Sequence, residues 1–262
     1  MTAAGEIYRG AARYYATHIT PFSHEIFRSL ARVCRLAGSS RALDLGAGTG
    51  LFSIPLARSV GNVLSVDPCD EMLQEGRLRA EILGIKNIDF LVSRSEDLIE
   101  TASSFDIATI ANSFNWMDRP TVLAKLAKML TPDGCIAIVN SEYDESEPGD
   151  WRDGMWSAVE EFWKGSLPPG RAVRSALVAS DREVLRASEF SEITELRHYF
   201  ERHRNVDDVL GYLHSMSFAT PHVLGARREE FTRRIRQLLL SYSPSGSFVE
   251  RGHVTTLVGY RP

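Results

Sequence analysis

The sequence lacks the features that mark membrane-spanning and disulfide-stabilised proteins. Its only cysteines, Cys34, Cys69 and Cys135, are far apart and form no disulfide or metal-ligand pattern. No apolar run approaches the roughly 20 residues that a membrane helix needs. The first residues show no basic segment followed by an apolar one. We therefore expect no disulfide framework, metal site, signal peptide or membrane partner, and a location in the reducing cytoplasm.

The chain also lacks an excess of positive charge. Its 30 basic and 34 acidic residues give a formal net charge of -4, so nucleic acid is not an expected partner. With 44% apolar residues the chain is too apolar to be disordered. Its 262 residues suit one enlarged domain or a domain with a small cap. We expect a monomer or homodimer that acts on a small molecule.

Short apolar runs alternate with amphipathic stretches over residues 41–140. The runs typical of buried strands are 41–45, 63–66, 88–92, 106–110 and 135–140. The stretches with helical spacing are 52–60, 70–83, 95–101 and 119–130. Asp70 and Asp118 are candidate N-caps, and Gly84 is a candidate helix end. This alternation predicts a doubly wound, Rossmann-like α/β fold with a mostly parallel sheet.

The flanking segments are predicted to complete the sheet and to cover it. Residues 6–37 have a helical pattern that breaks at Thr20-Pro21. Beyond the core we expect helices at 151–163, 180–187, 205–215 and 227–242, and strands at 192–200 and 254–260, which makes seven strands. We divide the chain into an N-terminal helical lid (1–37), a cofactor-binding core (38–140) and a segment that completes the sheet (141–262). The last segment includes a helical substrate cap at about 141–180 and 201–246.

The most informative segment is Asp44-Leu45-Gly46-Ala47-Gly48-Thr49-Gly50, where a strand runs into a glycine loop that opens a helix. Glycines there allow positive φ angles and close approach of a ligand to the backbone. The spacing G-x-G-x-G differs from the G-x-G-x-x-G of dinucleotide sites, and no G-K-[S/T] marks a P-loop. Asp67 ends the second strand, where a carboxylate can accept both hydroxyls of a ribose.

Several motifs in order resemble those of one enzyme family. They are the glycine loop, Val66-Asp67-Pro68, Ser93-Arg94-Ser95-Glu96-Asp97-Leu98, Phe105-Asp106-Ile107, Ser113-Phe114-Asn115-Trp116-Met117-Asp118 and Leu130-Thr131-Pro132-Asp133-Gly134. The chain resembles class I S-adenosylmethionine-dependent methyltransferases, most closely the small-molecule group with the ubiquinone-biosynthesis and trans-aconitate enzymes. The resemblance implies S-adenosylmethionine as the cofactor and S-adenosylhomocysteine as its product.

The resemblance also implies roles for individual residues. Gly46, Ala47 and Gly48 line the methionine and ribose part of the cofactor, and Asp44 orients its ammonium group. Asp67 holds the ribose hydroxyls. The remaining cofactor contacts that it implies are Tyr15, Pro68, Met72, Ser95, Glu96 and Asn112. For Glu96 a purely structural role, as a carboxylate at a helix N-terminus, stays open.

The sequence contains weaker indications of the residues that contact the methyl acceptor. His18 and Asn115 are candidate catalytic residues, although Asn115 replaces a histidine common in the family and cannot act as a base near neutral pH. Trp116, Tyr212 and His214 are candidate substrate contacts. The alternative for His18, Tyr212 and His214 is an ordinary place on a helix or at the surface. Trp151, Trp156, Phe162 and Trp163 could line an apolar pocket or pack a helix onto the sheet.

These patterns predict an enzyme that transfers a methyl group to oxygen, nitrogen or carbon of a small, aromatic or apolar metabolite. The [D/N/S]-P-P-[Y/F] motif of amino-methylating DNA enzymes is missing after the fourth strand. Two alternatives remain open. One is a non-catalytic module that keeps the cofactor pocket, and the other is a polyamine-synthase-like or nicotinamide-dependent enzyme on a similar sheet.

Overall fold

Seven strands form one sheet at the centre of the computed structural model, which describes residues 6–99, 102–144, 150–163 and 180–262. Along the sheet the order is β3-β2-β1-β4-β5-β7-β6. The strands are β1 (Arg41–Leu45), β2 (Asn62–Asp67), β3 (Ile88–Val92), β4 (Phe105–Ala111), β5 (Leu130–Tyr143), β6 (Glu192–Asn205) and β7 (Ser247–Tyr260). Parts of the predicted lid, cap and 95–101 helix lie outside the described residues.

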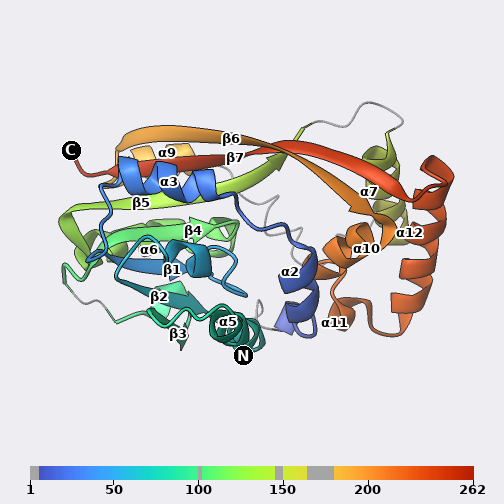
Figure 1. Ribbon diagram of the computed structural model, residues 1–262, viewed down its shortest axis with the longest axis horizontal. Coiled ribbons are helices and arrows are strands. Elements are labelled where there is room, and N and C mark those ends of the chain that lie inside the picture. The colour runs from blue at the N-terminus through green and yellow to red at the C-terminus, as the bar shows by residue number, and fades with distance from the viewer. Residues whose placement is uncertain (1–5, 100–101, 145–149, 164–179) are drawn as a thin grey trace.

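The pairing of these strands confirms the predicted sheet. Strands β1 to β5 pair in parallel, whereas β7 runs antiparallel to both β5 and β6. The chain therefore starts in the middle of the sheet, builds outward to β3, and returns to β4 on the other side of β1 (Figure 1). This reversal of direction is where open α/β sheets bind ligands, outside the carboxyl ends of their strands.

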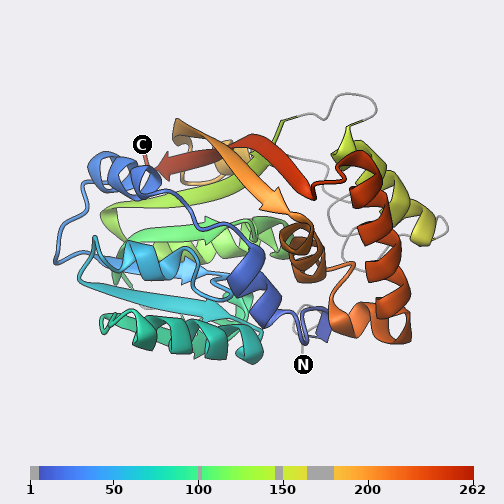
Figure 2. The ribbon, with the colours of Figure 1, turned by 45° about the vertical axis from the view of Figure 1, so that its right-hand side comes forward.

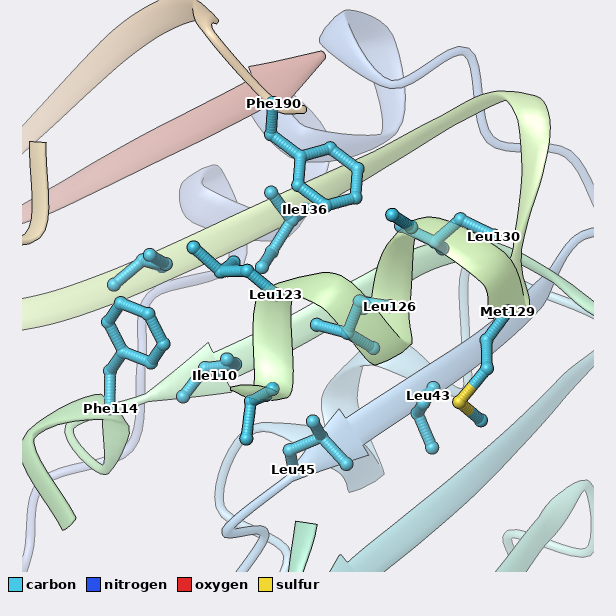
Figure 3. Close-up of a cluster of buried hydrophobic side chains, with 14 of the residues drawn as sticks. Leu43, Leu45, Ile110, Phe114, Leu123, Leu126, Met129, Leu130, Ile136 and Phe190 are labelled. Atoms are coloured by element: carbon cyan, nitrogen blue, oxygen red, sulfur yellow. The ribbon is translucent and has the colours of Figure 1, made fainter. Parts of the chain in front are cut away.

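Helices cover both faces of the sheet. On one face α6 (Arg119–Met129) and α9 (Asp181–Arg186) bury an apolar cluster, and Figure 3 shows Leu123 and Leu126 of α6 directed at the strands that carry Leu45 and Ile110. On the other face α3 (His24–Val33) and α4 (Ser53–Leu56) pack on the same strands. Burial of each large apolar side chain contributes about 1.5–3 kcal/mol, so these two clusters hold the sheet in place.

A separate group of helices forms a cap at one end of the sheet. It consists of α7 (Trp151–Phe162), α10 (Val206–Ser215), α11 (Pro221–Leu224) and α12 (Arg228–Tyr242), which share one apolar cluster. Figures 1 and 2 show that the long strands β6 and β7 extend from the sheet to this cap. The short helix α2 (Ala12–His18) lies between the two parts, in contact with α10 and with α5 (Asp70–Ile82).

The last three strands extend further than the sequence predicts. β5 spans Leu130–Tyr143 instead of 135–140, β6 continues five residues past Phe200 to Asn205, and β7 begins at Ser247 instead of Val254. For β6 and β7 the reason is their continuous antiparallel register, which pairs Glu192 with Tyr260 at one end and Asn205 with Ser247 at the other. β5 continues to Tyr143 because it pairs with β7 as far as Gly252. Ladder hydrogen bonds thus maintain the strands where their side chains are too polar to predict them.

Three predicted helical features are wrong in detail. Helix α4 covers only Ser53–Leu56, because the next turn tightens to i→i−3 bonds such as Ser59 N to Leu56 O (2.8 Å). The described part of 95–101 holds only the 3₁₀ turn η1 (Ser95–Asp97). Asp70 is the first residue of α5 and does not cap it. The cap at Asp118 is confirmed, since its side chain accepts from Thr121 N (3.3 Å).

A buried ion pair connects the β6–β7 hairpin to α2. Arg204 Nε donates to Glu250 Oε2 over 2.9 Å, and both side chains are only 5% exposed. Arg204 Nη1 also donates to the carbonyl of His18 at the end of α2 (3.0 Å). One side chain therefore joins two strands and a helix at the boundary between sheet and cap.

Replacement of this arginine should cost far more stability than replacement of a neighbouring one. Arg204→Ala should lower the free energy of unfolding by about 3–5 kcal/mol, because it leaves the Glu250 carboxylate buried without its partner. Arg251→Ala breaks an exposed pair with Glu201 on the same hairpin and should cost no more than about 1 kcal/mol. Urea denaturation of both variants measures the difference, and equal losses would contradict a buried, energetically coupled pair.

Candidate functional site

A cavity of about 370 Å³ lies at the carboxyl ends of β1, β2 and β4. Its wall contains these residues that the sequence singles out: Tyr15, Gly46, Gly48, Asp67, Pro68, Met72, Ser95, Glu96, Asn112 and Trp116. Residues far apart in the chain meet there because parallel strands end at the same edge of the sheet. The volume is in the range that small-molecule sites occupy in proteins.

The glycine loop forms the part of the wall that follows β1. Gly46 has φ +66°, and a Cβ atom on it would lie 2.5 Å from Ser113 Oγ, closer than real contacts allow. Gly48 has φ +55°, and a Cβ there would point toward Tyr15 at 3.9 Å. Both residues are therefore glycine for backbone reasons. The side chain of Ser113 packs against Gly46, whereas the main chain of Gly48 is open to the cavity below Tyr15.

Asp67 fixes the loop from the adjacent strand. Its Oδ2 accepts from Gly48 N (2.9 Å) and its Oδ1 accepts from Cys69 N (2.8 Å). Burial raises the pKa of this carboxyl above its usual range, while the two backbone donors oppose the shift. Each oxygen keeps lone pairs beyond these two bonds, so the carboxylate can still accept hydroxyl donors from the cavity.

Asp44 lies behind the loop and is not part of the cavity wall. It is buried, and its carboxylate accepts hydrogen bonds from Ser53 Oγ and from Thr109 Oγ1 (2.6 Å). Burial raises the pKa of Asp44 to about 6. Its neighbour Ala47 is also outside the wall and donates its N–H to Val66 O (3.0 Å). The position of Asp44 suits support of the loop more than direct contact with a ligand.

Two further polar residues in the wall have structural partners. Glu96 Oε1 accepts from the backbone N of Asp118 (2.9 Å), and together with Arg94 this lowers the pKa of the Glu96 carboxyl. Asn112 has φ +52°, and its Oδ1 accepts from Ser141 N (2.8 Å). Both side chains connect the loops after β3 and β4 to neighbouring segments. The structural role considered for Glu96 corresponds to its hydrogen bond with the backbone of Asp118, the N-cap residue of α6.

The N-terminal segment covers the cavity. Tyr15 on α2 is partly buried there, and burial of its hydroxyl together with the charge of Asp67 raises the pKa of that hydroxyl to about 12, so it stays protonated. The carboxylate of Glu71 accepts from Gly10 N (2.9 Å). The rings of Tyr8 and Trp116 meet edge to face at 6.0 Å. Contacts from three parts of the chain thus hold this segment over the wall.

The two candidate catalytic residues do not line the cavity. The ring of His18 packs against Gly211 of α10, where a Cβ would lie 2.1 Å from its Cδ2, and its Nδ1 is 3.5 Å from Asp208 Oδ1. His18 is the last residue of α2, and its ring contacts α10 of the cap. Asn115 lies on the 3₁₀ turn η2 (Phe114–Trp116) beside the wall residue Trp116 without being part of the wall.

The substrate candidates on the cap are also placed differently from one another. His214 is buried, with its Nδ1 3.0 Å from Ala219 O and its Nε2 3.0 Å from Thr232 Oγ1, so both ring nitrogens are occupied. Burial lowers its pKa. Tyr212 lines a second, smaller cavity in the cap. Trp156 and Trp163 pack within the cap cluster, and Trp156 also lines this smaller cavity.

Other residues of the wall escaped the sequence analysis as site candidates. They are Ile7, Tyr8, Cys69, Arg94, Ala111, Ser113 and Met117. Ser113 and Met117 belong to the motif after β4, and this position in the motif could have marked them as site residues. In the described part of the chain, no cluster of three or more His, Cys, Asp or Glu side chains could hold a metal ion, and no helix is long and apolar enough to cross a membrane.

Fold and wall together define an α/β protein with a nucleotide-type site at the switch point of its sheet. Residues 42–134 match the family model described as "Methyltransferase domain". An uncharacterized methyltransferase of Mycobacterium tuberculosis strain H37Rv is 32% identical over 109 residues, 42% of this chain and 43% of the relative. A ubiquinone biosynthesis O-methyltransferase of Xanthomonas axonopodis pv. citri is 31% identical over 120 residues, 40% of this chain and 50% of the relative.

A solved structure extends the similarity to most of the fold. The candidate type II methyltransferase from Anaeromyxobacter dehalogenans superposes with a TM-score of 0.56 at 20% identity, over 92% of this chain and 97% of that one. The curated relatives are matched over half of their length or less. The similarity to a methyltransferase domain therefore covers residues 42–134, and the fold around this segment is similar to that of a solved methyltransferase.

Loss of the Asp67 carboxylate should weaken cofactor binding. We expect Asp67→Ala to cost about 1–3 kcal/mol in S-adenosylhomocysteine affinity, because the ribose hydroxyls lose their acceptor. Asp70→Ala, three residues away at the start of α5, is the matched control. Titration calorimetry on both variants, after their thermal unfolding has been compared, gives the answer. An affinity of Asp67→Ala equal to that of the wild type would remove Asp67 from the site.

The raised pKa of Asp44 makes a second prediction, on stability. A carboxyl with a folded pKa of about 6 against an ordinary value of 3.8 binds its proton more tightly in the folded state. Its contribution to stability is therefore complete below about pH 4 and is lost as the pH rises through 6, by about 2–3 kcal/mol. In urea unfolding from pH 4 to 7, the wild type should lose this amount of stability relative to Asp44→Asn, which does not titrate. A difference independent of pH would mean that Asp44 is ionised throughout.

Proposed function

We propose that this protein transfers a methyl group from S-adenosylmethionine to oxygen, nitrogen or carbon of a small, aromatic or apolar metabolite. The observation that carries the proposal is the cavity at the switch point, whose wall combines the glycine loop with the Asp67 carboxylate. A carboxylate beside an open backbone suits a ribose attached to a larger polar group. The methyltransferase domain match over residues 42–134 supports the same conclusion.

The residues present fit this cofactor. A Cβ atom on Gly46 would clash with Ser113, and one on Gly48 would strain the backbone and enter the space below Tyr15, which glycine leaves free. In this proposal Gly46, Ala47 and Gly48 line the methionine and ribose part, and Asp67 accepts the ribose hydroxyls. Pro68, Met72, Ser95 and Glu96 surround the adenine, Asn112 lies at the methionine end, and Tyr15 covers the cofactor.

Methyl transfer requires the protein mainly to position the two reactants. S-adenosylmethionine supplies, when bound, an already activated methyl group on a neutral leaving group. The protein then has to align the acceptor with that methyl group and to exclude water. Tyr15, Tyr8 and Trp116 suit the exclusion of water, because they close the cavity from the lid side and from the loop after β4. A base is required only where the acceptor must lose a proton.

The division of labour in the chain follows from this proposal. The core, residues 38–140, binds the cofactor, and the lid (1–37) and the cap (about 141–180 and 201–246) select the acceptor. We propose a cytoplasmic monomer or homodimer without a nucleic-acid partner, supported by the net charge of -4 and the three unpatterned cysteines. A non-catalytic module and a nicotinamide-dependent or polyamine-synthase-like enzyme are the other outcomes of the tests below.

Release of S-adenosylhomocysteine is the decisive measurement. The protein should produce it from S-adenosylmethionine when it is incubated with a metabolite extract, and mass spectrometry should detect a product heavier by one CH2 group. Incubation without the extract is the control for slow hydrolysis. Tight cofactor binding without turnover on any fraction would favour the binding module. Fluorescence titration with reduced nicotinamide cofactor tests the dehydrogenase alternative, which predicts saturable binding.

The glycine loop can be tested with a matched pair of substitutions. Gly48→Val should reduce S-adenosylhomocysteine affinity at least tenfold, since its side chain would enter the space below Tyr15. Gly84→Val introduces the same side chain at a glycine of similar conformation (φ +67°), with nothing within 4 Å of the new Cβ. This control should bind normally. Equal affinity of the two variants would remove the loop from the site.

A further inference from the structure

A second cavity lies in the cap, where β5, β6 and β7 meet α7 and α10. Its volume is about 30 Å³, enough for a group the size of a carboxylate but not for a whole metabolite. Tyr143, Trp151, Trp156, Arg204, Tyr212 and Glu250 form most of its wall. The wall thus combines one buried cation with aromatic rings, which is uncommon for a space that serves packing alone.

The cation in this wall has an unused donor. Arg204 uses Nε for Glu250 and Nη1 for the carbonyl of His18. Its Nη2 is buried and has no hydrogen-bond partner among the residues that the structure describes. A buried N–H group without an acceptor is costly, so an oxygen atom that enters the cavity would satisfy it.

The charges around the cavity are unequal. Glu250 lies opposite Arg202 in the β6–β7 register and accepts from Arg204. Arg202 is partly buried with its guanidinium 3.8 Å from the centre of the Phe200 ring. No carboxylate of the described ranges lies within ion-pair distance of it. Arg152 also lines the cavity, with its guanidinium 5.1 Å from the centre of the Tyr143 ring. One carboxylate and three guanidinium groups therefore surround this place, and the surplus is positive.

Two tyrosine hydroxyls lie at this place, and the hydroxyl of Tyr212 donates a hydrogen bond to that of Tyr143, which leaves the Tyr143 hydrogen available as a donor. The rings of Tyr143 and Tyr212 are 6.2 Å apart and nearly perpendicular. Burial raises the pKa of both hydroxyls, so both remain protonated. An anionic, planar group is the ligand that arginine and phenol donors between aromatic rings recognise best.

The cavity also adjoins the cofactor site. Tyr15 lies in the wall of the larger cavity, about one turn of α2 before His18. The same helix, α2, carries Tyr15 and ends at His18, whose carbonyl binds Arg204. A molecule held in the smaller cavity would therefore extend along α2 toward the cofactor.

We propose that the Arg204 cavity binds a carboxylate group of the methyl acceptor, with Arg204 Nη2 and the hydroxyl of Tyr143 as donors. The acceptor is then a carboxylic acid whose flat, apolar body passes Tyr15 to reach the methyl group. This inference rests on the proposed function and narrows its substrate class. The competing explanation is that Arg204 and Glu250 form only a structural pair.

Two conservative variants separate these explanations. Arg204→Lys keeps a cation for Glu250 but removes the second terminal nitrogen that faces the cavity. Glu250→Gln keeps an oxygen for Arg204 Nε but removes the competing charge. Arg251→Lys, in the exposed pair with Glu201 across the same two strands, is the matched control. Thermal unfolding establishes first that all three variants are folded.

The experiment is a calorimetric titration of the protein saturated with S-adenosylhomocysteine. The probes are benzoate, phenylacetate and 3,4-dihydroxybenzoate, each compared with its neutral amide. At least one carboxylate should bind tenfold or more tightly than its amide. Arg204→Lys should remove this preference, Glu250→Gln should strengthen carboxylate binding severalfold, and Arg251→Lys should leave it unchanged.

The contrary outcomes point to different failures. If S-adenosylhomocysteine itself does not bind, the proposed function fails and this inference falls with it. If S-adenosylhomocysteine binds but no carboxylate is preferred over its amide, the inference alone is overturned. Retention of the preference in Arg204→Lys, or weaker carboxylate binding in Glu250→Gln, would likewise reduce the pair to a structural role.

Discussion

The parallel pairing of β1 with both β2 and β4 is the constraint on which the cofactor site depends. It brings Gly46, Asp67 and Asn112, which follow or end three different strands, to one edge of the sheet. The hydrogen bonds of Asp67 to Gly48 N and Cys69 N then fix the loop and the second strand end to each other. Lid and cap are added to a site whose backbone is already in place.

Sequence reasoning located this core because its signals are local. Buried parallel strands are apolar over their whole length, and a strand that enters a glycine loop has few alternatives. The order of the first five strands and of the helices between them was therefore predictable. The ends of these strands were predictable to within a few residues, except for β5. The glycine loop and Asp67 were predictable for the same reason, since their spacing relative to strand ends is fixed by the fold.

The cap side of the protein was less predictable, because its contacts join distant segments. His18 and His214 are good candidates by residue type, yet one packs on Gly211 and the other is hydrogen-bonded inside the cap. Arg204 and Glu250 stand in charged stretches that read as solvent-exposed. Only the register of β6 on β7 turns both inward as diagonal neighbours, with Glu250 opposite Arg202 and Arg204 opposite Phe248. No local pattern distinguishes this arginine from its exposed neighbours.

The charges of β6 have a consequence for the protein in concentrated solution. This strand is the free edge of the sheet, and its 14 residues pair on one side only. A long, unpaired apolar edge would invite other chains to add to it and aggregate. Glu192, Glu195, Arg197, Glu201 and His203 place charged or titratable groups along that edge. The chain can therefore support a distant cap on a long strand and still discourage edge-to-edge association.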